Sequence, residues 1–263
     1  MKYSFMSFSC PELDLDGMLR IAAEYGYQGV EPRVESKHGH GLELDATAAF
    51  RAEAKAKAAA SGIAFSCLAT SCRYADPATC QEHVDDTIGY IDLASDIGAP
   101  ALRVFGGTIP AGIEREAAIK AVTAALKQVA DHAAARDVKV CFETHDHWCL
   151  PEHVAEVMRR VDHPAIRVNW DIMHPVRVEQ VAMADAYATL KPWISHCHFH
   201  DGATTDGKLA MVPIGEGIID HETALKLLEA DRFAGYMSGE WINWQPYAEH
   251  LPRELATMKG YHA

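Results

Sequence analysis

The chain has 263 residues, of which 49% are hydrophobic, and its 37 acidic residues exceed its 24 basic residues to give a formal net charge of −13. A surface this acidic repels phosphate groups, so the composition argues against nucleic acid and anionic membranes as partners and favours cations or small molecules. No stretch has the apolar length of a signal peptide or a membrane span, which predicts a cytoplasmic protein.

Eight short runs rich in β-branched and aromatic residues alternate with longer segments of helical spacing. In chain order, the predicted strands begin near Lys2, Gly29, Ile63, Leu102, Val138, Ile166, Ile194 and Gly235. Between the second and third strands, the Ala-rich run 45–61 is a predicted helix, with Asp45 as its N-cap and Gly62 as its C-terminal stop. The pattern is typical of an α/β protein.

The regular alternation of strand and helix predicts a parallel sheet. Eight repeats of about 33 residues each favour closure into a single (β/α)8 TIM barrel, and no linker divides the chain, so we expect one domain over residues 1–263. A doubly wound sheet is the alternative. It would bind a nucleotide, but no G-x-G-x-x-G follows the first strand and no G-x-x-x-x-G-K-[ST] occurs.

In a barrel of this type, the functional residues lie at the C-terminal ends of the strands. The last four predicted strands carry there, in order, Glu143, Asp171, His198 and Glu240. Three carboxylates at one barrel mouth repel one another unless a cation lies among them. Oxygen ligands with one imidazole suit Mn²⁺, Mg²⁺, Co²⁺ or Zn²⁺, and the lack of thiolates argues against structural zinc. The strand ends therefore predict one divalent metal ion as cofactor.

Basic residues in the predicted barrel leave a second interpretation open. The carboxylates could instead form an interior salt-bridge network with Arg103, Lys139 and Arg167. On the second strand, Glu31 and Arg33 are expected to pair with each other or with Arg103 rather than to reach the site.

Six short motifs follow one another along the whole chain: GYQGVE at 26–31, ETH at 143–145, DIMH at 171–174, HFHD at 198–201, GEG at 215–217 and GYMSGEW at 235–241. With them the chain resembles the xylose isomerase-like TIM barrel superfamily, in particular its sugar phosphate isomerase/epimerase branch. The resemblance implies the same four metal ligands that the strand ends indicate. One position departs from the family pattern, because the Lys of H-x-K-D is His200 here.

A metal ion at the barrel mouth polarises the carbonyl of an α-hydroxy ketone or aldehyde and acidifies the neighbouring C–H. The resemblance implies that Glu143 and Glu240 are the catalytic pair, one removing the proton to give an enediolate and the other returning it. We therefore expect an isomerase or epimerase of a sugar, keto-sugar or inositol-derived ketone. Its partner is then a small carbohydrate or polyol, and assembly into a homo-oligomer is left open.

Four further side chains are predicted to contact the substrate: His174, His145, His200 and Trp241. His174 lies three residues beyond a ligand, where it either binds a substrate oxygen or orients Asp171. His145 is a substrate contact or a loop residue. His200 places a titratable ring where the family has a permanent cation. Trp241 either walls the pocket or packs on the barrel rim.

Three other functions compete with isomerisation. The same enediolate could expel a β-hydroxyl, which would make the protein a dehydratase. Apurinic endonucleases share the barrel, but they bind three zinc ions with additional histidines from the third and fourth strands, and the ends of those strands at 67–70 and 104–107 carry none. A barrel without catalysis that serves as a binding protein is the last alternative, and the complete ligand quartet argues against it.

Overall fold

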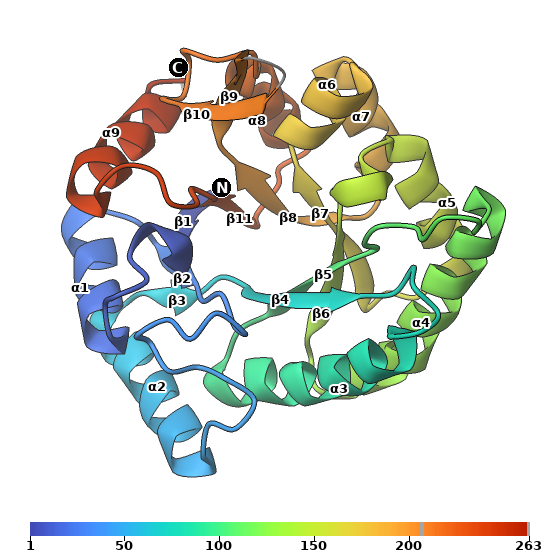
Figure 1. The fold of residues 1–263 in the computed structure, drawn as a ribbon. Coiled ribbons are helices and arrows are strands. Elements are labelled where there is room, and N and C mark those ends of the chain that lie inside the picture. The colour runs from blue at the N-terminus through green and yellow to red at the C-terminus, as the bar shows by residue number, and fades with distance from the viewer. Residues whose placement is uncertain (206–207, 262–263) are drawn as a thin grey trace.

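The computed structural model describes residues 1–205 and 208–261. Its main sheet has nine parallel strands in the order β3-β2-β1-β11-β8-β7-β6-β5-β4, and it curls into a nearly closed barrel (Figure 1). Parallel neighbours need a crossover between them, which the helices supply. The strands are β1 Lys2–Met6, β2 Gly29–Glu31, β3 Ala64–Phe65, β4 Leu68–Arg73, β5 Ala101–Phe105, β6 Lys139–Glu143, β7 Ile166–Asp171, β8 Ile194–Phe199 and β11 Tyr236–Gly239.

One predicted strand is broken in two. The strand expected to begin near Ile63 becomes β3 and β4, with residues 66–67 between them. Because β3 pairs with β2 and β4 pairs with β5, the sheet has its seam here. Backbone hydrogen bonds from Val34 N to Ala69 O (3.0 Å) and from Ala69 N to Pro32 O (2.9 Å) hold the seam together. Counted as one strand, β3 and β4 complete the predicted (β/α)8 TIM barrel, which is confirmed.

Helices form the outer ring of the barrel (Figure 1). The helix in the Ala-rich run begins after Thr47, whose side chain accepts a hydrogen bond from Phe50 N at 3.2 Å, so the prediction of Asp45 as N-cap was wrong. Gly62 ends that helix with φ 72°, as predicted. The helices are α1 Leu15–Tyr25, α2 Ala48–Ser61, α3 Cys80–Ile97, α4 Arg115–Ala135, α5 Pro151–Val161, α6 Met173–Glu179, α7 Met183–Leu190, α8 His221–Ala230 and α9 Tyr247–Gly260.

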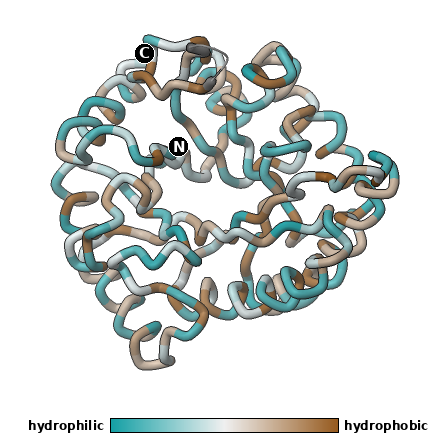
Figure 2. The backbone as a smooth tube through the Cα atoms, viewed as in Figure 1, coloured by the Kyte–Doolittle hydropathy of each residue, from teal (hydrophilic) through white to brown (hydrophobic). Residues whose placement is uncertain are grey.

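Apolar side chains fill the layer between the sheet and the helices, and α5, for example, buries Val154, Val157 and Met158 on one face. Hydrophobic and hydrophilic stretches accordingly alternate along the outer helices (Figure 2). Among the described helices, none combines the length and apolar content that crossing a membrane requires. The barrel also holds a set of polar side chains with at most 1% exposure, namely Glu31, Arg103, Glu143, Asn169, His196 and His198.

An antiparallel hairpin that the sequence did not predict, β9 (Asp201–Thr205) and β10 (Lys208–Val212), follows β8 directly. Asp201 anchors the loop after it, because its carboxylate accepts backbone N–H groups of Gly215 (3.0 Å), Gly217 (3.1 Å) and Ile219 (3.2 Å). A Cβ at position 217 would lie 2.1 Å from Asp201 Oδ1, so only glycine allows this approach. The HFHD and GEG motifs thus fix the hairpin at the rim of the barrel.

Candidate active site

The four predicted metal ligands meet at the mouth of the barrel. One ligand atom each of Glu143, Asp171, His198 and Glu240 lies within 4.8 Å of all the others, and the four residues are buried. The register of the sheet explains this meeting, because Asp171 on β7 pairs directly with His198 on β8. Glu143 ends β6 on one side, and Glu240 follows β11 on the other. The strands therefore bring together residues that lie up to 97 positions apart (240 − 143 = 97).

His198 is at the centre of a network of carboxylates. Its Nδ1 lies 2.7 Å from Glu143 Oε1 and 3.2 Å from Glu240 Oε2, while its Nε2 lies 3.1 Å from Glu31 Oε1. Burial alone lowers the pKa of His198, but the negative charges of Glu31, Glu143 and Glu240 outweigh it and raise that pKa well above its ordinary value. For Glu240 the signs are reversed: burial raises the pKa of this carboxyl, but the positive charges of His198 and Arg103 outweigh burial and lower the pKa to about 2.

The expected mutual pairing of Glu31, Arg33 and Arg103 was wrong. Arg103 instead approaches Glu143, with Nε 3.4 Å from Oε2, and donates a hydrogen bond to a backbone carbonyl of β4. Arg33 instead lies at the seam of the barrel, where it donates a hydrogen bond to Ala69 O at 3.2 Å and pairs with Glu35 at 3.7 Å. Glu31 faces the barrel axis, where both of its oxygens contact imidazole rings. Glu31 is the last residue of β2, whereas Arg33 lies two residues beyond that strand and so contacts the neighbouring segment at the seam.

Two buried oxygen atoms of the quartet lack a hydrogen-bond partner, namely Glu143 Oε2 and Asp171 Oδ2. A buried carboxylate oxygen without a partner is costly, and a cation relieves that cost. The donor set of three carboxylates and one imidazole suits a hard or borderline divalent cation. Among the described ion pairs, Arg103 is the one Arg or Lys that reaches the quartet, so the alternative network with Lys139 and Arg167 does not form. The residues present therefore fit a divalent metal ion.

Three of the predicted substrate contacts line a cavity of about 250 Å³ beside the quartet. His145, His174 and His200 form its polar wall together with Glu240. The ring centroids of His145 and His174 lie 4.5 Å apart, and those of His174 and His200 lie 5.9 Å apart. The remaining wall is apolar and consists of Met173, Leu209, Met211 and Ile242. The cavity thus offers hydrogen-bonding imidazoles on one side and, on the other, an apolar surface from α6, the hairpin strand β10 and the loop after β11.

The three histidines have different environments. Burial lowers the pKa of His174. Burial also opposes the charged form of His200, but the negative charge of Asp171 and a contact of 2.9 Å with that carboxylate raise its pKa. For His145, the hydrogen-bonded carboxylate of Asp146 outweighs burial and raises the pKa to about 9. The polar wall therefore combines one imidazole whose pKa is lowered, His174, with two whose pKa values are raised, His145 and His200.

Trp241 lies away from the cavity. Its ring is fully buried, stacks near Trp244 at 6.5 Å and packs edge-on against Phe199. A Cβ at Gly239 would lie 2.1 Å from the ring of Trp241, so this tryptophan fills the space behind β11. The structure thus brings three of the four predicted substrate contacts to one cavity and packs Trp241 into the rim.

Sequence reasoning gave no site role to two residues that contact the quartet. Glu31 ends β2 at the same depth as the other strand-end carboxylates, and that position was a signal that could have identified it. Asn169 lies two residues before Asp171 on β7, and its Nδ2 is 3.1 Å from His198 Nδ1. Residues two apart on a strand share a face, so the period of the strand could have revealed Asn169.

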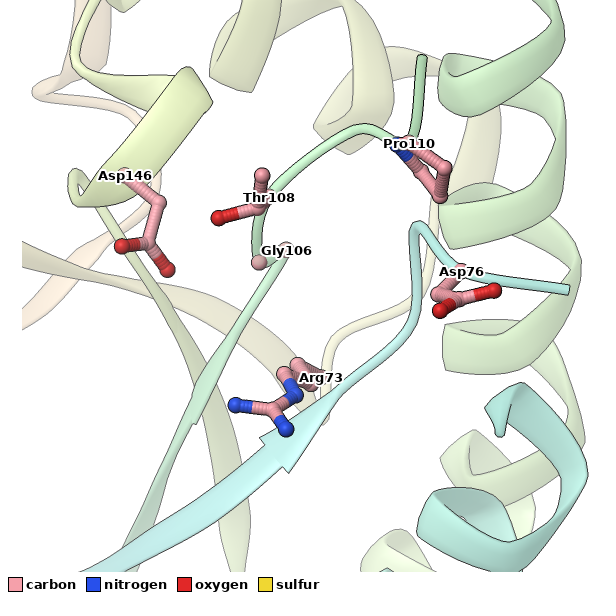
Figure 3. A pocket seen from close by; sticks show the side chains of 7 residues that line it. Arg73, Asp76, Gly106, Thr108, Pro110 and Asp146 are labelled. Carbon is pink, nitrogen blue, oxygen red and sulfur yellow. The ribbon is translucent and has the colours of Figure 1, made fainter. Parts of the chain in front are cut away.

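A larger cavity of about 420 Å³ lies beside the ends of β4 and β5. It is lined by Arg73, Asp76, Gly106, Gly107, Thr108, Pro110 and Asp146. In Figure 3, the polar ends of Arg73, Thr108 and Asp146 point toward the same space. The ion pair between His145 and Asp146, 3.0 Å long, lies between this cavity and the smaller one. None of the residues predicted for the site lines the larger cavity.

The sequence matches one protein family and one curated protein. The model of the xylose isomerase-like TIM barrel family matches residues 19–260. Among curated proteins, 3-dehydroshikimate dehydratase from Bacillus anthracis is 26% identical over 136 residues, which cover 44% of this chain and 47% of that protein. The match thus spans about half the length of this curated relative.

Solved structures resemble this chain over almost its full length. The probable 3-DHS dehydratase involved in petrobactin synthesis from Bacillus anthracis has a TM-score of 0.81 at 19% identity, with 98% of this chain and 99% of that chain covered. The 3-keto-D-glucoside 4-epimerase from E. coli has a TM-score of 0.81 at 17% identity, with 99% of each chain covered. At these identities the structures show a shared fold, whereas the family match extends over nearly the whole sequence. The chain therefore belongs to the xylose isomerase-like TIM barrel family, as its motifs predicted.

Proposed function

We propose that this protein is a divalent-metal-dependent isomerase or epimerase that acts on a small sugar, keto-sugar or inositol-derived ketone. The observation that carries the proposal is the position of two carboxylates, Glu143 and Glu240, which reach the same nitrogen of His198 from two different strand ends. One carboxylate would remove the proton and the other would return it, an arrangement that allows the proton to come back on the opposite face. The bound metal ion would polarise the substrate carbonyl and so acidify the neighbouring C–H.

The side chains of this chain divide the remaining work. Glu143, Asp171, His198 and Glu240 would hold the metal ion. Glu240 is ionised at neutral pH because its pKa is about 2, so it can accept a proton. His174, His145 and His200 line the cavity, where their ring N–H groups could donate hydrogen bonds to the oxygens of an enediolate, and His145, with a pKa of about 9, would add a positive charge. The cavity of about 250 Å³ suits a ligand the size of a monosaccharide.

A second candidate is a metal-dependent dehydratase that uses the same site. The observation in its favour is the sequence match to 3-dehydroshikimate dehydratase over 136 residues. Both reactions begin with removal of a proton beside a carbonyl. They differ in the next step, since isomerisation returns the proton whereas dehydration expels a hydroxyl from the adjacent carbon.

The two reactions give different products in deuterated water. The metal-loaded protein would be incubated with a panel of ketoses, 3-keto-sugars, inososes and 3-dehydroshikimate, and the products followed by NMR and ultraviolet absorbance. Deuterium at the exchanged carbon with retention of all oxygens supports isomerisation or epimerisation. A conjugated enone or aromatic product supports the dehydratase. Failure of every substrate to exchange its proton, with metal bound, contradicts both.

Variants of the two glutamates test the division of roles. We expect Glu143→Gln and Glu240→Gln each to lower turnover by about 10² or more, because an amide cannot transfer the proton. Glu53→Gln makes the same change on the exposed face of α2 and is the matched control, expected to keep full turnover. Normal turnover in either site variant would remove that residue from the catalytic pair.

A further inference from the structure

We propose that the cavity of about 420 Å³ beside the ends of β4 and β5 binds a second sugar unit, so that the substrate is a disaccharide or other glycoside. Its reacting ring would lie in the cavity of about 250 Å³ beside the quartet. This inference rests on the proposed function, because it extends the sugar that the smaller cavity would take. Pockets for small molecules measure about 300 to 1,000 Å³, so the larger cavity is by itself of that size.

The two cavities are neighbours. His145 lines the smaller cavity, and the next residue in the chain, Asp146, lines the larger one. The two side chains form an ion pair of 3.0 Å, so a single pair of residues separates the two spaces. In Figure 3, Asp146 lies at one end of the larger cavity, and Pro110 and Asp76 lie at the other end. The larger cavity therefore leads away from the smaller one, as the second ring of a two-ring ligand requires.

The polar groups of the larger cavity have hydrogen-bonding capacity to spare. In the part of the chain that the structure describes, no ion pair or hydrogen bond engages the guanidinium of Arg73 or the hydroxyl of Thr108. Asp76 uses Oδ1 to accept the N–H of Ala78 at 2.9 Å, and its other oxygen has no such hydrogen bond. These groups and the carboxylate of Asp146 surround one space from three different loops (Figure 3).

The balance of charge selects a neutral polyhydroxyl ligand. One guanidinium faces two carboxylates, Asp76 and Asp146, so a phosphate or carboxylate group would meet more repulsion than attraction. A sugar hydroxyl both donates and accepts, and it can therefore donate to a carboxylate and accept from Arg73 at the same time. The ring of Pro110 adds an apolar surface against which the C–H groups of a sugar can pack.

Hydrogen bonds between the loops hold the walls of the cavity in place. Gly106 O accepts the N–H groups of Tyr74 (3.1 Å) and Ala75 (2.8 Å), which joins the loop after β5 to the loop after β4. Ile109 N donates to His147 Nδ1 at 2.9 Å, which joins the loop after β5 to the turn after β6. Walls that are already fixed lose little conformational freedom when a ligand binds, so the affinity is greater.

The backbone also positions the two charged groups nearest the reacting ring. Gly107 has φ 82°, and a Cβ there would lie 2.9 Å from Arg73 Cβ and 3.2 Å from Arg73 Cδ. Glycine thus lets the stem of Arg73 lie on the backbone of the next strand's loop, with its guanidinium toward the cavity. Asp146 has φ 49°, a region that Asp and Asn adopt more readily than other residues with a side chain.

Sugar binding tests the second subsite without any need for turnover. The full chain, loaded with Mn²⁺, would be titrated by isothermal titration calorimetry with D-fructose and with four ketoses that carry a second sugar: turanose, maltulose, lactulose and isomaltulose. D-glucose would be compared with maltose and cellobiose in the same way. We expect at least one disaccharide to bind about 10-fold more tightly than its monosaccharide, because the second ring adds hydrogen bonds to charged groups.

Two variants then locate the gain in the larger cavity. Arg73→Met removes the charge, and Thr108→Phe fills the space with an aromatic ring. Each should remove about 10-fold of the affinity for the disaccharide and leave the affinity for the monosaccharide unchanged. Arg20→Met makes the same change on the exposed face of α1 and is the matched control, expected to bind both sugars as the wild type does.

The outcomes separate the second subsite from the proposed function. The subsite is overturned if no disaccharide exceeds its monosaccharide, or if the variants weaken both sugars equally. Tighter binding of a fructose phosphate, lost in Arg73→Met, would assign the cavity to an anion and overturn a neutral second ring. Proton exchange without a disaccharide gain leaves the proposed function standing and removes the subsite. A disaccharide gain without exchange in any substrate does the reverse.

Discussion

The carboxylate of Glu31 holds His198 in one orientation: its Oε1 lies 3.1 Å from His198 Nε2, so the other ring nitrogen, Nδ1, faces Glu143 and Glu240. The second oxygen of Glu31 lies 2.8 Å from His196 Nε2. Burial raises the pKa of Glu31, but the two imidazoles outweigh it and hold that pKa well below its ordinary value. A charged Glu31 keeps the proton on Nε2 and leaves Nδ1 free as a metal ligand.

Glu31→Gln should therefore weaken metal binding without touching a ligand. We expect the dissociation constant for Mn²⁺ or Co²⁺ to rise about 10- to 100-fold, because the amide no longer fixes the proton on His198 Nε2. Isothermal titration calorimetry measures the change. Glu24→Gln, on the exposed face of α1, is the control and should leave affinity unchanged. Unaltered affinity in Glu31→Gln would show that His198 needs no such support.

Arg103→Met should act on stability and on metal affinity in opposite directions. Arg103 Nε lies 3.4 Å from Glu143 Oε2, with both side chains 1% exposed. Loss of the guanidinium leaves a buried carboxylate unpaired, so the metal-free protein should lose about 3 kcal/mol of unfolding free energy. The same change removes a positive charge beside the site, so metal affinity should rise. Urea unfolding with and without Mn²⁺ measures both, and a variant whose metal affinity falls would refute this account.

His40 should make stability depend on pH below neutrality. Its ring is 2% exposed, Nδ1 accepts the N–H of Leu42 at 3.0 Å, and Nε2 lies 3.2 Å from Arg33 O, which fixes a neutral tautomer. Burial and the nearby His38 lower its pKa to about 4, against about 6.5 for an unfolded chain. Between these values the unfolded state binds the extra proton, so stability falls as pH drops and is unaffected above 6.5.

The full effect of His40 amounts to about 3 kcal/mol at pH 4. His40→Asn keeps an acceptor for Leu42 N but does not titrate, so its unfolding free energy should vary less between pH 7 and pH 4 than that of the wild type. Guanidinium unfolding at several pH values gives the comparison, with His132→Asn as the control. Parallel curves for the wild type and His40→Asn would exclude this histidine as the source.

Gly106→Ala should displace a buried tryptophan. A Cβ at position 106 would lie 2.2 Å from Trp148 Nε1, and Trp148 is fully buried with that nitrogen donating to Gly107 O at 2.9 Å. Overpacking of this kind costs about 1–3 kcal/mol, and the lost hydrogen bond adds to it. Urea unfolding followed by tryptophan fluorescence measures the loss. Gly260→Ala, where no heavy atom lies within 4 Å, should leave stability nearly unchanged.

The meeting of the four predicted ligands could be foreseen from the sequence because it depends on one regular feature. Each of Glu143, Asp171, His198 and Glu240 lies at or just beyond the end of a strand, and parallel strands of a barrel end at the same face. Asp171 and His174 are also close in the chain, so their proximity follows from a single turn. The helix start at Thr47 was missed because both Asp45 and Thr47 are good N-caps, and only the turn before the helix selects between them.

The side chains that contact the four strand-end residues and their neighbours could not be predicted, because these contacts form only in the closed barrel. Glu31 and His196 are 165 positions apart, and their contact of 2.8 Å exists because β1 and β11 place β2 near β8. The hairpin after β8 is likewise held by a contact distant in the chain, because the carboxylate of Asp201 accepts hydrogen bonds from backbone N–H groups 14 to 18 residues later. No local pattern encodes such contacts, since the side chains involved carry no periodic signal of their own.

The sequence by itself determined the barrel and which four side chains, predicted as metal ligands, lie at the strand ends with histidines near them, because strand period and strand ends are local properties of the chain. Only the tertiary structure decided which groups face one another. In the folded barrel Arg103 lies against Glu143, and Arg33 lies against Glu35. Trp241 packs into the rim, and His200 contacts Asp171. The reason is physical: buried charges select partners by distance in the folded barrel, and that distance is fixed only when the sheet has closed.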